Sequence, residues 1–211
     1  MVMAGELVYL RWLLVPAFNS GGLRPDGGRS LGLANGLSLL RGGLYAVVAG
    51  FVVVSPTAVP WGPAICYGVG VGMDWLDGRV AKTIGRTTRL GEQLDLAFDT
   101  LGFVVAPVVA VVWGQLPVWY LSLSAARYVF KAGVAIRRRR GNPVYELPLS
   151  RLRRPLAALQ MCFLTVALMP VVSLSMVRLP AVCLLSASLL LFGRDYLAVT
   201  GRLGLSRARP N

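Results

Sequence analysis

The chain has 211 residues, of which 55% are hydrophobic and only 15% are charged, and its formal net charge is +13. Soluble domains carry charged residues at nearer a quarter of their positions, so this composition excludes an ordinary soluble protein and indicates a membrane protein. No RNA- or DNA-binding motif accompanies the positive charge. We therefore expect the positive charge to lie in cytoplasmic loops and to attract anionic lipid, and we do not expect nucleic-acid binding.

The first predicted element is the short apolar segment 7–18, which a polar stretch follows. It is too short to cross a membrane, where a helix needs roughly 20 apolar residues, and it lacks the features of a signal peptide. We therefore expect an amphipathic helix lying on the membrane surface, within an interfacial segment at residues 1–34. A disordered or partly inserted tail is the alternative.

Six apolar segments follow, and each is a candidate membrane span. They lie at residues 42–60, 61–75, 94–113, 117–136, 155–172 and 179–199. The sequence therefore predicts an all-α, polytopic membrane protein with six transmembrane helices. These helices form one domain over residues 1–211, with the membrane core at about 42–200.

The distribution of arginine and lysine predicts the orientation of these spans. Connection 79–90 holds four basic residues and connection 137–154 holds seven arginines, whereas the connections on the opposite side hold only Arg178. We expect the basic connections and both termini on the cytoplasmic side, which an even number of spans allows. A prokaryotic inner or plasma membrane is the expected location.

Acidic residues are concentrated in one short window of the chain. Five of the nine fall between positions 74 and 99. Asp74 and Asp77 are three residues apart, and Asp95 and Asp99 are four apart, so each pair shares a helical face. Two antiparallel helices would bring the four carboxylates together at the cytoplasmic ends of the second and third spans.

Clustered carboxylates repel each other in a low-dielectric setting, so either some are protonated or cations neutralise them. The chain has no histidine, and oxygen ligands suit hard ions, so we expect two divalent cations, Mg²⁺ or Mn²⁺. Such ions would orient and neutralise a diphosphate. Gly78, Ala81 and Gly91 lie on the same helical faces and leave room for a bulky group against the backbone.

This window resembles the signature of the CDP-alcohol phosphotransferase family, with lysine where the family has arginine. The matching string is Asp74-x2-Asp77-Gly78-x2-Ala81-Lys82-x8-Gly91-x3-Asp95-x3-Asp99. Residues 35–41, which lead into the first predicted span, also resemble the family, though more weakly. The resemblance covers about residues 30–200.

The resemblance implies an enzyme of phospholipid biosynthesis that works as a homodimer. It would transfer the phosphatidyl group of CDP-diacylglycerol, or of a related CDP-lipid, to the hydroxyl of an alcohol and release CMP. Asp74, Asp77 and Asp95 would be metal ligands. Asp99 would face the metals as well and act as the general base on the acceptor hydroxyl.

The resemblance also implies a nucleotide site. Gly78, Ala81 and Gly91 would make room for the cytidine nucleotide. Lys82 would lie near the nucleotide or its phosphates, where lysine keeps the charge of the family's arginine but loses its bidentate fork.

Cationic residues inside the spans, or at their ends, indicate where the acceptor binds. The candidates are Arg127, Lys131, Arg153, Arg154 and Arg194. Arginine suits phosphate, so we expect a water-soluble polyol phosphate, such as glycerol 3-phosphate or inositol phosphate. In the alternative reading Lys131 extends to the membrane surface, Arg194 pairs with Asp195, and Arg153 and Arg154 only set the topology.

The acceptor and the protein class both have alternatives. Serine, an amino alcohol or another lipid would be acceptors compatible with the same aspartates. A divalent-cation transporter is the competing class, but the four aspartates share one expected membrane depth and no acidic residue lies in the outer half of a span.

Overall fold

The computed structural model describes residues 33–84, 89–145 and 150–202, and the side chains of residues 36–76, 97–145 and 150–202. This part of the chain holds six α-helices, two short 3₁₀ helices and no strand, which confirms the all-α fold. The elements are α2 (Leu33–Gly50), η1 (Phe51–Val53), α3 (Gly62–Ile84), α4 (Arg89–Val112), η2 (Val118–Leu121), α5 (Ser122–Arg139), α6 (Arg153–Ala167) and α7 (Leu174–Val199).

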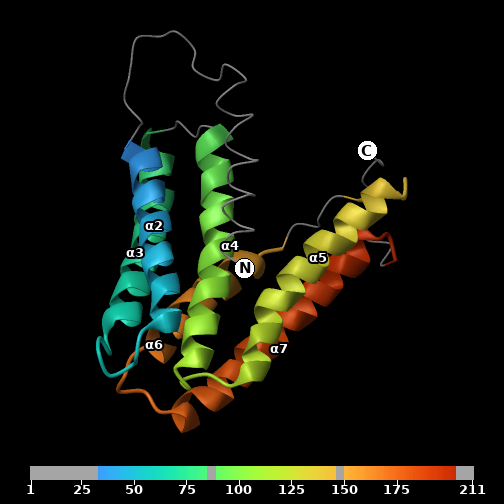
Figure 1. The fold of residues 1–211 in the computed structure, drawn as a ribbon. Coiled ribbons are helices and arrows are strands. Elements are labelled where there is room, and N and C mark those ends of the chain that lie inside the picture. The colour runs from blue at the N-terminus through green and yellow to red at the C-terminus, as the bar shows by residue number, and fades with distance from the viewer. Residues whose placement is uncertain (1–32, 85–88, 146–149, 203–211) are drawn as a thin grey trace.

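Successive α-helices run in alternating directions (Figure 1). Helices α2, α3 and α4 stand side by side, and α2 contacts both of the others. Helices α5 and α7 form a second, tilted pair, and α6 contacts α3, α4 and α7. This arrangement brings the C-terminal half of α3 alongside the N-terminal half of α4, which are the two halves of the aspartate motif.

Each predicted span overlaps one observed helix, but the bounds differ. The first span, predicted at 42–60, is wrong by several residues, because α2 ends at Gly50 and the chain continues through η1 into turns. Pro56 and Pro60 lie in this region. Proline lacks the backbone N–H of a helical hydrogen bond and so disfavours a helix, although it leaves the apolar run unbroken. Most of the predicted basic connection 79–90 is helical, since α3 continues to Ile84 and α4 begins at Arg89.

Among the residues that the structure describes, two segments are long and apolar enough to cross a membrane, namely Gly36–Val53 and Leu174–Val199. Only 28% of the first and 22% of the second is buried, which is low for the core helix of a soluble protein. A shorter apolar helix covers Ala97–Val112. The six spans therefore remain a prediction, and the interfacial helix at 7–18 lies outside the described residues.

Tyr45 fixes the spacing of α2, α3 and α4. Its side chain is fully buried, and its ring lies against Gly70 of α3 and Gly102 of α4. A Cβ at Gly70 would lie 2.5 Å from the ring, and one at Gly102 would lie 2.8 Å from it. Only glycine allows the three helices to approach this closely around an aromatic ring.

Side-chain bonds to the backbone position α5 against α4. Trp113 Nε1 donates to the carbonyl of Phe51 at 2.9 Å, and this bond holds the end of α4 against η1. Ser124 Oγ donates to the carbonyl of Phe103 at 2.7 Å, in a buried setting. The first turn of α5 is thereby fixed to the middle of α4, one turn beyond Asp99.

Candidate active site

Two of the four motif aspartates meet across the interface between α3 and α4. A single nitrogen of Arg41, Nη1, pairs with Oδ1 of Asp74 and lies 3.6 Å from Oδ1 of Asp99. Arg41 comes from α2 and its side chain is 0% exposed, whereas the side chains of Asp74 and Asp99 are 34% and 30% exposed. The two carboxylates therefore converge on one buried cation while each keeps an accessible side.

The other motif residues lie on the same two helices. Asp77 follows Asp74 by one turn of α3, and Asp95 precedes Asp99 by one turn of α4. Helical spacing places each pair on one face, as the sequence predicts. The side chains of Asp77 and Asp95 lie outside those described, so the four-carboxylate cluster stays a prediction.

The predicted nucleotide site falls on the same stretches of helix. Gly78, Ala81 and Lys82 lie on α3, and Gly91 lies on α4. Their side chains and surroundings are outside the described part of the structure. Their helical backbone agrees with the spacing argument, and their role in nucleotide binding stays a prediction.

The donors at Asp74 and Asp99 fit a hard divalent cation. Both are carboxylate oxygens, both are partly accessible, and they face each other from different helices. Their negative charge is concentrated enough to hold a buried guanidinium. No group of three or more His, Cys, Asp or Glu is assembled among the described side chains, where Asp77 and Asp95 are not included.

Sequence reasoning did not assign a role to Arg41. It ended the weakly matching segment 35–41, just outside the first predicted span. In the structure Arg41 lies inside the apolar segment Gly36–Val53 and is fully buried. The available signal was that Arg41 is the only charged residue in that segment, and charges at such positions usually have a partner.

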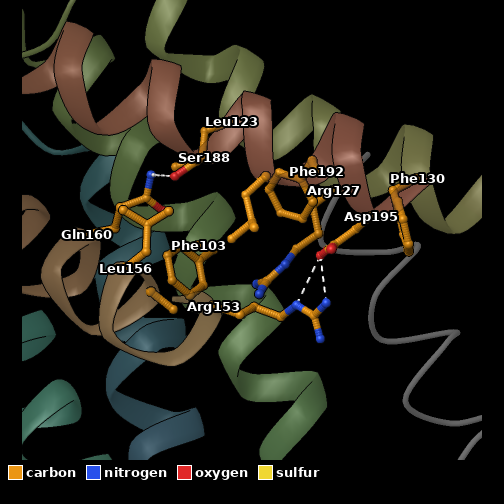
Figure 2. A pocket seen from close by; sticks show the side chains of 12 residues that line it. Phe103, Leu123, Arg127, Phe130, Arg153, Leu156, Gln160, Ser188, Phe192 and Asp195 are labelled. Atoms are coloured by element: carbon orange, nitrogen blue, oxygen red, sulfur yellow. Dashed lines mark hydrogen bonds and ion pairs between the residues drawn. The ribbon is translucent and has the colours of Figure 1, made fainter. Parts of the chain in front are cut away.

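A cavity of about 160 Å³ lies between α4, α5, α6 and α7 (Figure 2). Its walls are mainly apolar. The larger apolar side chains are Phe103, Leu123, Phe130, Leu156, Leu191 and Phe192. In a pocket with mainly apolar walls, the few polar groups fix the orientation of whatever binds.

The polar groups of the cavity include an ion pair and a hydrogen-bonded pair (Figure 2). Arg153 Nη2 lies 2.8 Å from Oδ2 of Asp195, and Arg153 Nε donates to the same oxygen at 3.0 Å. Gln160 Nε2 donates to Ser188 Oγ at 2.7 Å. The cavity therefore combines apolar walls with a buried carboxylate that is already paired.

Arg127 connects this cavity to the aspartate site. Its Cζ lies 4.5 Å from the centre of the Phe103 ring, a cation–π contact, and Phe103 follows Asp99 by one turn on the same face of α4. One turn along α5, Lys131 Nζ donates to Thr100 Oγ1 at 3.2 Å. The cationic face of α5 is thus directed toward the stretch of α4 that carries Asp99.

The five predicted acceptor cations occupy different surroundings. Arg127 and Arg153 line the cavity, and Lys131 contacts α4 beside it. Arg154 is exposed, and Arg194 lines a separate, shallow depression with apolar residues of α7. The contribution of all five to acceptor binding stays a prediction.

The structure also changes the partner expected for Asp195. The alternative reading paired this residue with Arg194, its neighbour in sequence, but Asp195 pairs with Arg153 across 42 residues. Adjacent residues on a helix point in different directions, so Arg194 and Asp195 face different surroundings. Sequence reasoning also missed Gln160 and Ser188, since nothing in an isolated Gln or Ser distinguishes a cavity position from a packing position.

Comparison with known proteins identifies the family of the chain. Residues 31–197 match the family model described as CDP-alcohol phosphatidyltransferase. Over 105 residues the chain is 37% identical to proteins of Mycobacterium bovis and Mycobacterium tuberculosis named "Putative cardiolipin synthase". That match covers 50% of this chain and 49% of theirs, so the chain spans about half the length of the curated relatives it matches. Because the family model extends over most of its length, the chain belongs to the CDP-alcohol phosphatidyltransferase family, whose members are enzymes of phospholipid biosynthesis.

Proposed function

We propose that this membrane protein transfers the phosphatidyl group of a CDP-diacylglycerol-type lipid to an alcohol hydroxyl and releases CMP. The observation that carries the proposal is the convergence of Asp74 and Asp99, from facing helices, on one nitrogen of Arg41. Negative charge gathered in a largely apolar bundle costs free energy unless it is used to hold cations. Family membership identifies the CDP-linked diphosphate as the group that such cations would serve.

The bond changes of this reaction balance without a further reactant. The acceptor oxygen forms a bond to the phosphatidyl phosphorus, and the bond from that phosphorus to the bridging oxygen of CMP breaks. CMP leaves with the bonding electron pair. Asp99 takes the proton of the acceptor hydroxyl, and its partly exposed carboxylate on α4 gives that proton a path to solvent.

Asp74, Asp77, Asp95 and Asp99 would hold two Mg²⁺ or Mn²⁺ ions. When bound, these ions supply charge neutralisation for the diphosphate and for the departing CMP. Gly78, Ala81 and Gly91 leave space for the nucleotide, and Lys82 offers a single cationic contact to its phosphates. The homodimer and the cytoplasmic side for this site are part of the same proposal.

For the acceptor, the cavity favours another lipid, an alternative that the sequence left open, over a free polyol phosphate. A free polyol phosphate carries a phosphomonoester with up to two negative charges, and mainly apolar walls compensate that charge poorly. A phospholipid headgroup carries a phosphodiester with a single negative charge. The relatives named for cardiolipin, a lipid in which two phosphatidyl groups share one glycerol, point to the same acceptor.

An acceptor panel tests the proposal. The purified full chain in mixed micelles is given CDP-dioleoylglycerol with Mg²⁺ or Mn²⁺, and CMP release and lipid products are measured. The acceptors are phosphatidylglycerol, glycerol 3-phosphate, inositol phosphate and serine. We expect metal-dependent CMP release with phosphatidylglycerol as the best acceptor, abolished by chelation. No CMP with any acceptor would reject the transferase and leave the cation transporter as the competing class.

A further inference from the structure

The charges that line the cavity between α4, α5, α6 and α7 come from three side chains, Arg127, Arg153 and Asp195. Asp195 is 5% exposed and accepts from two nitrogens of Arg153, at 2.8 and 3.0 Å. Arg127 Nη1 is buried and has no hydrogen-bond partner among the described residues. Within the described lining, Arg153 is therefore paired with a carboxylate and Arg127 is not. The carboxylate that acts on Arg127 is Asp99, which lies outside the lining on α4.

This charge balance matters because the surrounding walls are apolar. Phe103, Phe130 and Phe192 reduce the local screening by water, so each uncompensated charge acts more strongly on a bound anion than it would in solution. A phosphodiester carries a single negative charge. A phosphomonoester carries between one and two at neutral pH and needs more than one cation to match it.

We propose that Asp195 determines the charge class of the acceptor by neutralising Arg153. Arg127 remains as the cation that binds phosphate, so the cavity accepts a phospholipid headgroup with one negative charge and disfavours a free phosphomonoester. This inference rests on the proposed function, because it takes the cavity as the place where the acceptor binds.

Asp195 has a second feature that fits this role. Its Oδ1 is buried and has no hydrogen-bond partner in the described part of the chain. A non-reacting hydroxyl of a glycerol headgroup donates to this oxygen, while Oδ2 stays bound to Arg153. The carboxylate therefore selects against a second negative charge and for a hydroxyl in the same position.

The experiment compares kcat/KM for phosphatidylglycerol with that for glycerol 3-phosphate, using CDP-dioleoylglycerol and CMP release. Asp195→Asn keeps the shape of the side chain but leaves Arg153 uncompensated. We expect the wild-type preference for phosphatidylglycerol to fall by about tenfold or more in this variant. The double variant Arg153→Gln with Asp195→Asn removes both charges and should restore the preference to within about threefold of wild type. Arg178→Gln, exposed at the other end of α7, is the control and should leave the preference unchanged.

The outcomes separate this inference from the proposed function. No CMP release by the wild type with any acceptor rejects the proposed function, and the inference with it. A wild type that releases CMP but prefers glycerol 3-phosphate overturns the inference alone, as does an active Asp195→Asn with unchanged preference. If Asp195→Asn does not fold, the double variant decides, because a preference for glycerol 3-phosphate in that protein contradicts the charge argument.

Discussion

Arg41 Nη1 lies 3.6 Å from Asp99 Oδ1, although the two residues come from different helices and are 58 positions apart in the sequence. The same nitrogen also pairs with Asp74. The guanidinium is fully buried and therefore acts as a built-in counter-charge behind the two carboxylates. Divalent cations bound to the accessible side of those carboxylates would neutralise the rest of their charge.

Replacing Arg41 with methionine should make folding stability depend on divalent cations. Without metal, the free energy of unfolding of the variant should fall by about 3 kcal/mol. This is the low end of the range for breaking a buried ion pair, because the carboxylates are partly solvated. Mg²⁺ should recover more stability in the variant than in the wild type, because cations then neutralise Asp74 and Asp99. Thermal unfolding in detergent with EDTA or Mg²⁺ measures both effects. The control Arg178→Met, at an exposed site, should show neither the loss of stability nor the recovery by Mg²⁺. If Mg²⁺ does not restore stability to Arg41→Met, that result would argue against a metal at these carboxylates.

Asp99→Asn should abolish turnover while the folded protein remains in the membrane. Loss of a general base typically costs about 10²–10⁴ in rate, and this amide cannot accept the proton of the acceptor hydroxyl. Asp74→Asn is the matched comparison, because Asp74 lies against the same nitrogen of Arg41 and is a predicted metal ligand but not the predicted base. A higher metal concentration should partly restore the activity of that variant. CMP release measured across a metal titration distinguishes the two variants. Activity of Asp99→Asn near that of the wild type would contradict the assignment of the base.

The aspartate motif could be read from the sequence because its geometry is local. Asp74 and Asp77 share a face through spacing within one helix, as do Asp95 and Asp99, and those helices are present. Arg41 could not be assigned in the same way. Hydropathy placed the first span at 42–60, which left Arg41 just outside it. In the structure, α2 ends before the proline-containing turns, but these turns do not interrupt the apolar run and so leave no mark in the hydropathy.

The cavity residues, too, could be predicted only where their geometry is local to one helix. Sequence spacing placed Arg127 and Lys131 on one face of a helix, and both side chains do lie toward α4. The pairing of Arg153 with Asp195 depends on how α6 crosses α7, which neither segment encodes alone. Proximity in sequence favoured Arg194 as the partner, although side chains at consecutive helical positions diverge.

Arg127→Gln should weaken acceptor binding more than donor binding. The guanidinium lines the cavity beside Phe103, so its loss should raise the acceptor KM by about tenfold and change the CDP-lipid KM much less. Arg194→Gln tests the expectation from sequence that this residue also binds the acceptor, and its separate position on α7 predicts a smaller effect. Steady-state kinetics with each substrate varied in turn measures both. Equal effects of Arg127→Gln on the two KM values would indicate a role outside the acceptor site.

Gly70→Ala should destabilise the fold, whereas Gly72→Ala, two positions later on the same helix, should not. A Cβ at Gly70 would lie 2.5 Å from the ring of Tyr45, which is fully buried and also lies against Gly102. A Cβ at Gly72 meets nothing within 4 Å. Overpacking of this kind costs about 1–3 kcal/mol. Alanine at Gly72 should instead raise the free energy of unfolding by up to about 1 kcal/mol, because it reduces backbone freedom in the unfolded state. Thermal unfolding in one detergent compares the two variants directly. Adding Tyr45→Leu to Gly70→Ala should restore part of the lost stability, because it removes the ring that the new Cβ would meet. Equal stability of the two alanine variants would show that Tyr45 does not hold α2 and α3 at this distance.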